Sequence, residues 1–247
     1  MIVPTPLEGL IIAILVIFLG SLSYYYKILD LGGSIVSVIM GLIVGIFGSI
    51  YWLILLVIFV LLSYAATEYK FNTKKRKGVA EGKFGERGYK SVLANGLVPM
   101  IIALIPTSLF ASSLLYITSL SAATSDTVAS EFGLSSEKAY LITNLKRVNP
   151  GTNGGISLYG EAWAFAGAGI VSVFAFIIFY FAGIWKLDNY YFIIIATVIG
   201  FIGCQIDSVL GAVFENRNLL TKGQVNFLQI SISTIIAYIF YSINFIW

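Results

Sequence analysis

The stretch "KFNTKKRKGVAEGKFGERGYK", residues 70 to 90, decides how this chain is expected to lie in a membrane. It carries eight Lys or Arg residues and stands between long apolar segments. Basic loops stay in the cytoplasm when the helices beside them insert into a bilayer. We therefore predict that residues 70 to 90 are cytoplasmic, and the other segments can be placed by working outward from them.

The composition is that of a chain surrounded by lipid. Of 247 residues, 58% are hydrophobic and 11% are charged, whereas soluble domains contain about 25% charged residues. Histidine is absent, which argues against a Ser-His-Asp triad and against the common zinc sites. The one cysteine, Cys204, excludes an intramolecular disulfide.

Eight segments are apolar and close to the length of about 20 residues that crosses a bilayer. These predicted spans cover residues 7–25, 32–48, 51–67, 91–106, 108–132, 158–182, 189–213 and 225–246. The predicted fold class is an all-α, polytopic membrane helix bundle, with residues 1–247 forming a single transmembrane domain. The turns at Gly48-Ser49 and at Pro106-Thr107-Ser108 are tight, and either could instead belong to a re-entrant or half-length helix.

The distribution of charge orients these spans. With residues 70 to 90 inside, the loops near Lys27, at 133–157 and at 214–224 fall on the same side. Fourteen of the fifteen basic residues are then cytoplasmic, and only Lys186 is outside. We expect a multi-pass protein of the cell membrane, with both termini outside and its functional face in the cytoplasm.

Two aspartates lie within predicted spans at the same depth. Asp126 is in "ATSDTVASEFG" (123–133), and Asp207 is in "GCQIDSVLGAVFENR" (203–217). Ionisable groups at membrane depth cost a few kcal/mol each and are functional candidates. Each could be a separate interfacial residue, but the small residues around both allow close helix approach, which favours one shared site. Clustered carboxylates without histidine suit Mg²⁺, and the predicted ligands are Asp126, Asp207, Glu131 and Glu161.

A glycine-rich polar stretch, "VNPGTNGGISLYGEAW" (148–163), lies just before the sixth span. Gly154 and Gly155 would let the backbone approach a ligand closely, and the start of the next helix would offer N–H groups to an anion. Lys146 and Arg147 add positive charge, and we predict catalytic roles for both. The alternative is a simple turn between helices.

The basic loop also extends into "GVAEGKFGERGYKSVLANG" (78–96). Topology and attraction to anionic lipid explain "KKRK" at 74–77, but they do not explain Asn95 within the apolar fourth span. Asn95 either forms a hydrogen bond between helices or contributes to the functional site.

Four motifs, in order, resemble one family. "GVAE…G.RG…VLANG" (78–96), "SDTVASEFG" (125–133), "PGTNGGISLYG" (150–160) and "IDSVLGA" (206–212) are similar to the integral-membrane family that includes plant phytyl-phosphate kinase. The resemblance extends from about residue 30 to the end of the chain. "SAATSDTVASEFG" also resembles the aspartate block of CTP-dependent polyprenol kinases and phosphatidate cytidylyltransferases.

The resemblance implies a kinase that transfers phosphate from CTP, or another nucleoside triphosphate, to a prenyl monophosphate such as phytyl or geranylgeranyl phosphate. We expect Mg²⁺ as the cofactor, the membrane as the surroundings and no nucleic acid as a partner. The resemblance points to Asp126 and Asp207 as catalytic residues. The residues expected to bind nucleotide or lipid are Glu81, Arg87, Asn95, Ser130, Glu131, Thr152, Asn153, Gly154, Gly155 and Ser157.

The chemistry is compatible with the absence of histidine, because a phosphate monoester is already largely an anionic nucleophile at neutral pH. Two other functions are kept as alternatives. A CTP-dependent lipid cytidylyltransferase would use similar substrates, but the late lysine-rich signature of those enzymes and their PGHGG-like element are not matched here. An ion-coupled transporter could use paired aspartates, although transport sites typically lie nearer the midplane.

The predicted orientation can be checked by labelling. In a background without Cys204, single cysteines at Lys75, Ser136 and Lys222 should be protected from an impermeant thiol reagent added to intact cells, because all three lie in cytoplasmic loops. A cysteine at Asn189 should react. External labelling at Ser136 would contradict both the topology and the shared site.

Overall fold

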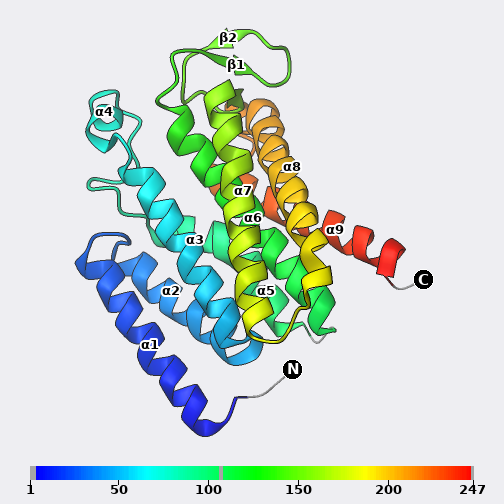
Figure 1. Cartoon of the computed structure of the whole chain (residues 1–247). Coiled ribbons are helices and arrows are strands. Elements are labelled where there is room, and N and C mark those ends of the chain that lie inside the picture. The colour runs from blue at the N-terminus through cyan, green and yellow to red at the C-terminus, as the bar shows by residue number, and fades with distance from the viewer. Residues whose placement is uncertain (1–3, 106–107, 246–247) are drawn as a thin grey trace.

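The computed structural model describes residues 4–105 and 108–245, and its long elements are helices (Figure 1). The α-helices are α1 (Pro6–Tyr25), α2 (Leu31–Ile43), α3 (Ile50–Glu68), α4 (Phe71–Arg76), α5 (Tyr89–Leu104), α6 (Leu109–Gly133), α7 (Leu158–Phe181), α8 (Tyr191–Val213) and α9 (Lys222–Phe245). The shorter elements are the π-helix η1 (Val44–Gly48), the 3₁₀ helices η2 (Leu187–Tyr190) and η3 (Glu215–Arg217), and the strands β1 (Ala139–Leu141), β2 (Arg147–Val148) and β3 (Gly155–Ile156).

The predicted membrane helix bundle is confirmed. Within the described part of the chain, six helical segments are long and apolar enough to cross a membrane. These are α1, α2 continued by η1, α3, α7, α8 with its flanking 3₁₀ turns, and α9. The other two predicted spans correspond to α5, which has 16 residues, and to α6, which has 25 residues and many Ser and Thr side chains.

Helix α6 can be polar because other helices enclose it. Every residue from Ala111 to Val128 is buried, and α6 packs against α3, α5, α7, α8 and α9. Two of its hydroxyl groups contact α7: Ser121 Oγ lies 3.1 Å from Ser172 Oγ, and Ser125 Oγ donates to the Ala164 carbonyl at 2.9 Å. Small and polar residues at helix contacts are typical of membrane bundles.

The first of the two tight turns joins η1 to α3. At the first, η1 ends at Gly48 and the Ser49 hydroxyl accepts from the Trp52 N–H at 3.3 Å, capping α3. Helices α2 and η1 together form a full-length span. At the second, Pro106 and Thr107 lie outside the described residues, as does residue 246 of the last predicted span. Helix α6 begins directly after Ser108, whose hydroxyl caps it.

The long loop between α6 and α7 contains a feature that the all-α prediction omits. Its three short strands form an antiparallel sheet in the order β2-β1-β3, with Ala139 opposite Val148 and Leu141 opposite Gly155. A polar loop outside the bilayer can satisfy its backbone by strand pairing, whereas hydrophobic periodicity detects only the longer elements. Figure 1 shows this hairpin and α4 at the same end of the bundle.

Gly154 fixes this loop onto α8. Its φ is +73°, and a Cβ added there would come within 2.7 Å of the Ala212 backbone nitrogen and would also clash with the Ser208 carbonyl oxygen. The Asn216 side-chain amide donates to the Asn153 carbonyl at 3.0 Å beside it. The loop backbone therefore lies directly against the helix that carries Asp207.

The importance of this contact can be measured with matched glycine variants. Gly78 also has a positive φ, of +71°, but a Cβ there would meet nothing within 4 Å. Both Gly154→Ala and Gly78→Ala should lose about 1–2 kcal/mol through the left-handed conformation. Gly154→Ala should lose about 1–3 kcal/mol more because the site is already filled. The thermal midpoint of the purified protein in detergent reports the difference, and equal midpoints for the two variants would contradict the packing role.

Candidate functional site

Two cavities meet at the loop-bearing end of the bundle. The first, here called the groove, has a volume of about 640 Å³ and lies among α5, α6, the start of α9 and the loop before α5. The second, here called the polar cavity, has a volume of about 310 Å³ and lies among α6, α7, α8 and the 150–157 loop. The residues that line both are Glu81, Asp126, Ser130, Glu131, Lys222 and Asn226.

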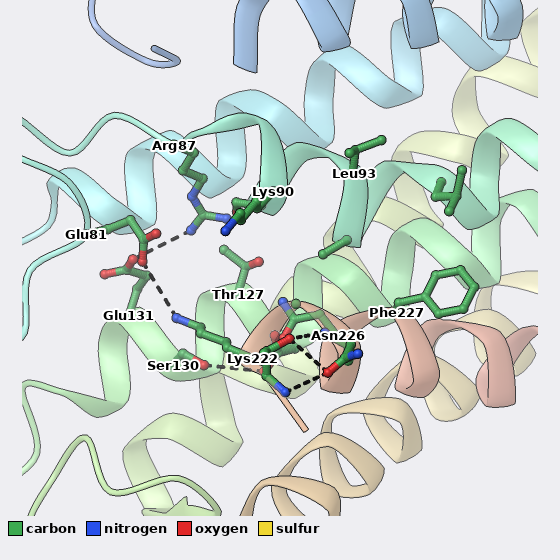
Figure 2. A pocket seen from close by; sticks show the side chains of 17 residues that line it. Glu81, Arg87, Lys90, Leu93, Thr127, Ser130, Glu131, Lys222, Asn226 and Phe227 are labelled. Carbon is green, nitrogen blue, oxygen red and sulfur yellow. Dashed lines mark hydrogen bonds and ion pairs between the residues drawn. The ribbon is translucent and has the colours of Figure 1, made fainter. Parts of the chain in front are cut away.

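The cavities differ in character. Leu93, Leu97 and Phe227 give the groove an apolar wall (Figure 2). The polar cavity is lined by the backbone and side chains of Thr152, Asn153, Gly154, Gly155 and Ser157, together with carboxylates. The predicted glycine stretch therefore does line a cavity, and that cavity reaches the predicted aspartates.

Asp126 and Asp207 are the central pair. Helix α6 carries Asp126 and α8 carries Asp207, and both line the polar cavity, where their carboxyl groups make side-chain contact. Ser130 Oγ donates to Asp126 Oδ1 at 3.3 Å. Asp207 Oδ2 is buried without a hydrogen-bond partner among the described residues. Buried polar oxygens normally have a partner, so this oxygen fits the side of a site that would face a cation.

Glu131 has a different environment. Its Oε2 accepts from Lys74 Nζ at 2.6 Å, and its Oε1 lies 3.6 Å from Arg87 Nη2 and accepts from Thr67 Oγ1 at 3.1 Å. Glu161 accepts from the Gln205 amide at 2.6 Å. Among residues 4–105 and 108–245, no group of three or more His, Cys, Asp or Glu side chains is arranged to hold a metal ion. The four predicted metal ligands thus separate into one aspartate pair and two glutamates with protein partners.

The start of α7, which we expected to offer N–H groups to an anion, has a side-chain cap. The Ser157 hydroxyl accepts from the Gly160 N–H at 3.0 Å and so caps the helix, and Glu161 brings a negative charge into its first turn. Gly154 was expected to let the backbone approach a ligand, but the backbone that it approaches is that of α8. Its loop still lines the polar cavity. The glycines are used to build the cavity wall.

Three predicted residues lie away from the cavities. Lys146 and Arg147 are exposed on the β1–β2 hairpin, and neither lines the groove or the polar cavity. Asn95 is buried, and its Oδ1 accepts from Asn226 Nδ2 at 3.4 Å, which joins α5 to α9. Asn95 therefore forms a hydrogen bond between helices, which was one of its two expected roles. Its partner Asn226 lines both cavities.

Three lysines of this region were not predicted as site residues from the sequence: Lys222, Lys90 and Lys74. Lys222 Nζ lies 3.6 Å from Glu81 Oε2 (Figure 2), and Lys222 lines both cavities, as Asp126 does. It stands at the first position of α9, where a lone lysine next to a span is usually a topology signal. Lys74 is 2% exposed although it belongs to the run "KKRK". Nothing in the sequence separates it from its exposed neighbours.

The family model described as "Integral membrane protein DUF92" matches residues 14–234. An uncharacterized membrane protein of Methanocaldococcus jannaschii is 36% identical over 217 residues, which are 87% of each chain. Protein VTE6, chloroplastic, of Arabidopsis thaliana is 32% identical over 77% of this chain and 58% of its own. Protein PGR of Arabidopsis thaliana is 31% identical over 78% of this chain and 74% of its own.

No solved structure matches this chain. The family model covers well over half of the sequence, and it includes all four motifs on which the family resemblance depends. The chain belongs to the integral membrane protein family DUF92.

Proposed function

We propose that the protein is a membrane kinase that transfers a phosphoryl group from CTP, or another nucleoside triphosphate, to a prenyl monophosphate, giving the diphosphate. One observation carries the proposal: an apolar groove and a polar cavity share Asp126 and Lys222 at their junction. The four motifs that resemble the phytyl-phosphate kinase family, all within the residues matched by the family model, support the same reaction class.

The groove suits the lipid substrate. Its apolar wall at Leu93, Leu97 and Phe227 can accept a hydrocarbon chain, and its other end carries charged side chains. A prenyl phosphate has the same division between an apolar tail and a charged head. Ligand sites are commonly apolar cavities with a few placed polar groups.

The polar cavity suits a nucleotide that arrives with a divalent cation. Its described lining includes one cation, Lys222, and the carboxylates Glu81, Asp126, Glu131, Glu161, Asp207 and Glu215. A triphosphate alone would be repelled by this excess of negative charge. Mg²⁺ usually binds through one or two carboxylates plus substrate phosphates, so Asp126 and Asp207 would hold it. The cation would supply charge neutralisation between the two polyanions.

The transfer needs no general base from the protein. An oxygen of the prenyl monophosphate forms a bond to the γ-phosphorus, while the bond from that phosphorus to the bridging oxygen breaks and the nucleoside diphosphate leaves. The attacking oxygen is already largely ionised at neutral pH. The residues at the junction therefore have to align the two phosphates and offset their charge, which is the main requirement of phosphoryl transfer.

The aspartate pair can be tested by removing one charge at a time. Asp126→Asn or Asp207→Asn should lower turnover by at least a hundredfold, which corresponds to about 2.7 kcal/mol of lost transition-state stabilisation. Asp188→Asn is the matched control and should retain activity, because Asp188 lies in η2, the turn between α7 and α8, and lines neither cavity. The measurement is the initial rate in detergent with Mg²⁺, with size-exclusion chromatography to check folding. Normal turnover in Asp207→Asn would show that the aspartates do not form one site.

The reaction can be separated from cytidylyl transfer by the position of the label. With geranylgeranyl or phytyl phosphate as acceptor, γ-labelled CTP should give a labelled lipid diphosphate and CDP, and α-labelled CTP should leave the lipid unlabelled. Label that enters the lipid from the α-position, with release of pyrophosphate, would assign the protein as a cytidylyltransferase. Absence of transfer from all four nucleoside triphosphates to any prenyl phosphate would overturn the kinase and favour transport.

A further inference from the structure

We propose that Arg87, Lys90 and Lys222 form the subsite for the phosphate of the lipid acceptor at the charged end of the groove, and that the buried Lys74–Glu131 ion pair holds Arg87 in this subsite. The inference rests on the proposed function in its choice of ligand. The arrangement of charges that carries it is independent of the reaction.

The three cations are distributed unequally between the cavities. All three line the groove, together with the carboxylates Glu81, Asp126 and Glu131, whereas the described lining of the polar cavity has Lys222 as its one cation beside six carboxylates. Figure 2 shows them at the end of the groove away from Phe227. A phosphate bound in the groove would therefore meet two cations of its own and share Lys222 with a nucleotide in the polar cavity.

Backbone donors add to this charge. Helix α5 begins at Tyr89 after Gly88, and no side chain caps it, although the Ser91 N–H donates to the Gly88 carbonyl at 3.0 Å and the Asp30 carboxylate lies beside Gly88. Arg87, Lys90 and Ser91 at this helix start all line the groove. The free N–H groups of a helix N-terminus and its dipole favour an anion. The start of α7, by contrast, is capped by Ser157, so of these two helix starts the one without a side-chain cap lies on the groove side.

Arg87 is fixed through its backbone and its side chain. Its N–H donates to the Ile28 carbonyl and its carbonyl accepts from the Asp30 N–H, both at 3.1 Å. Its Nη2 donates to Thr67 Oγ1 at 3.2 Å and lies 3.6 Å from Glu131 Oε1. A guanidinium has five donors in a rigid plane, so holding one edge in this way determines where the remaining donors point.

Glu131 can orient Arg87 because Lys74 fixes Glu131. The Lys74 side chain is 2% exposed, and its Nζ donates to Glu131 Oε2 at 2.6 Å and to the Ala66 and Thr67 carbonyls at 3.1 and 2.6 Å. It therefore bonds the last turn of α3 and the end of α6 at once. A buried ion pair with complete hydrogen bonding has a defined geometry, and loss of one partner is strongly destabilising. Lys74 is a positioning residue in this arrangement.

The subsite is tested with purified wild type and single variants, using geranylgeranyl monophosphate and CTP as probes. Arg87→Met should raise KM for the lipid about tenfold, the equivalent of one charge-assisted hydrogen bond. Lys90→Met should raise it by up to about fivefold because Lys90 is exposed. Both should leave KM for CTP unchanged, whereas Lys222→Met should raise both constants. An unchanged lipid KM in Arg87→Met, or a change confined to CTP, would overturn the subsite.

The positioning role is tested by comparing Lys74→Met with Lys77→Met, an exposed neighbour in the same basic run. Lys74→Met should raise the lipid KM about as much as Arg87→Met does. Lys74→Arg keeps the charge and should have a lipid KM between those of Lys74→Met and wild type. Lys77→Met should have the wild-type lipid KM. If Lys74→Met does not fold, Lys74→Met with Glu131→Gln removes both charges and should still show the raised lipid KM. A wild-type lipid KM in that folded double variant would contradict the positioning role.

A binding measurement separates this inference from the kinase reaction. Displacement of labelled geranylgeranyl monophosphate by unlabelled lipid should be weakened in Arg87→Met even where turnover is not measured. Geranylgeraniol, which lacks the phosphate, should bind wild type and Arg87→Met equally, and inorganic phosphate should compete only weakly. Arg87-dependent binding without turnover would retain the subsite and reject the kinase. Turnover together with lipid binding that does not depend on Arg87 would retain the kinase and reject the subsite.

Discussion

The enclosure of α6 is the constraint on which the rest of the structure depends. A helix with this many hydroxyl groups and with Asp126 and Glu131 near its end would be costly to expose to hydrocarbon. Its neighbours α3, α5, α7, α8 and α9 therefore surround it. Close contact with α8 is possible because a Cβ at Gly200 would lie only 2.8 Å from Ser121 Cβ. The same enclosure brings Asp207 to Asp126.

The span pattern was predictable from sequence because the energetic rules for lipid exposure act on every residue of a helix. The apolar runs and the basic loop at 70–90 were enough to predict the long helices and to bring two aspartates to one end. Asp126 and Asp207 do line one cavity, with Ser130 beside them. Helix α6 shows that a span need not be strongly apolar when protein surrounds it.

Pairwise contacts were not predictable, because they depend on geometry that composition does not encode. Membrane topology accounts for the basic run "KKRK" as a whole, yet Lys74 is buried while Lys75 and Lys77 are exposed. Lys74 differs because the chain reverses at Lys70, where φ is +50°, and returns it to the carbonyls at the end of α3. Lys146 looked suitable for a phosphate site, but a short sheet places it on an exposed hairpin.

The two cavities differ in the charged residues that they do not share: Arg87 and Lys90 line only the groove, and Glu161, Asp207 and Glu215 line only the polar cavity. The proposed reaction would bring two phosphate anions close together, and one set of cations serving both would not distinguish donor from acceptor. The polar cavity is rich in carboxylates, so under the proposed function it would take a nucleotide that brings its own cation, while Arg87 and Lys90 line the groove and not the polar cavity. Lys222 lies where the two meet. Under the proposed function, a nucleotide bound through a metal and a lipid phosphate bound by Arg87 and Lys90 would share one junction, and the different charges of the two linings would help to distinguish them.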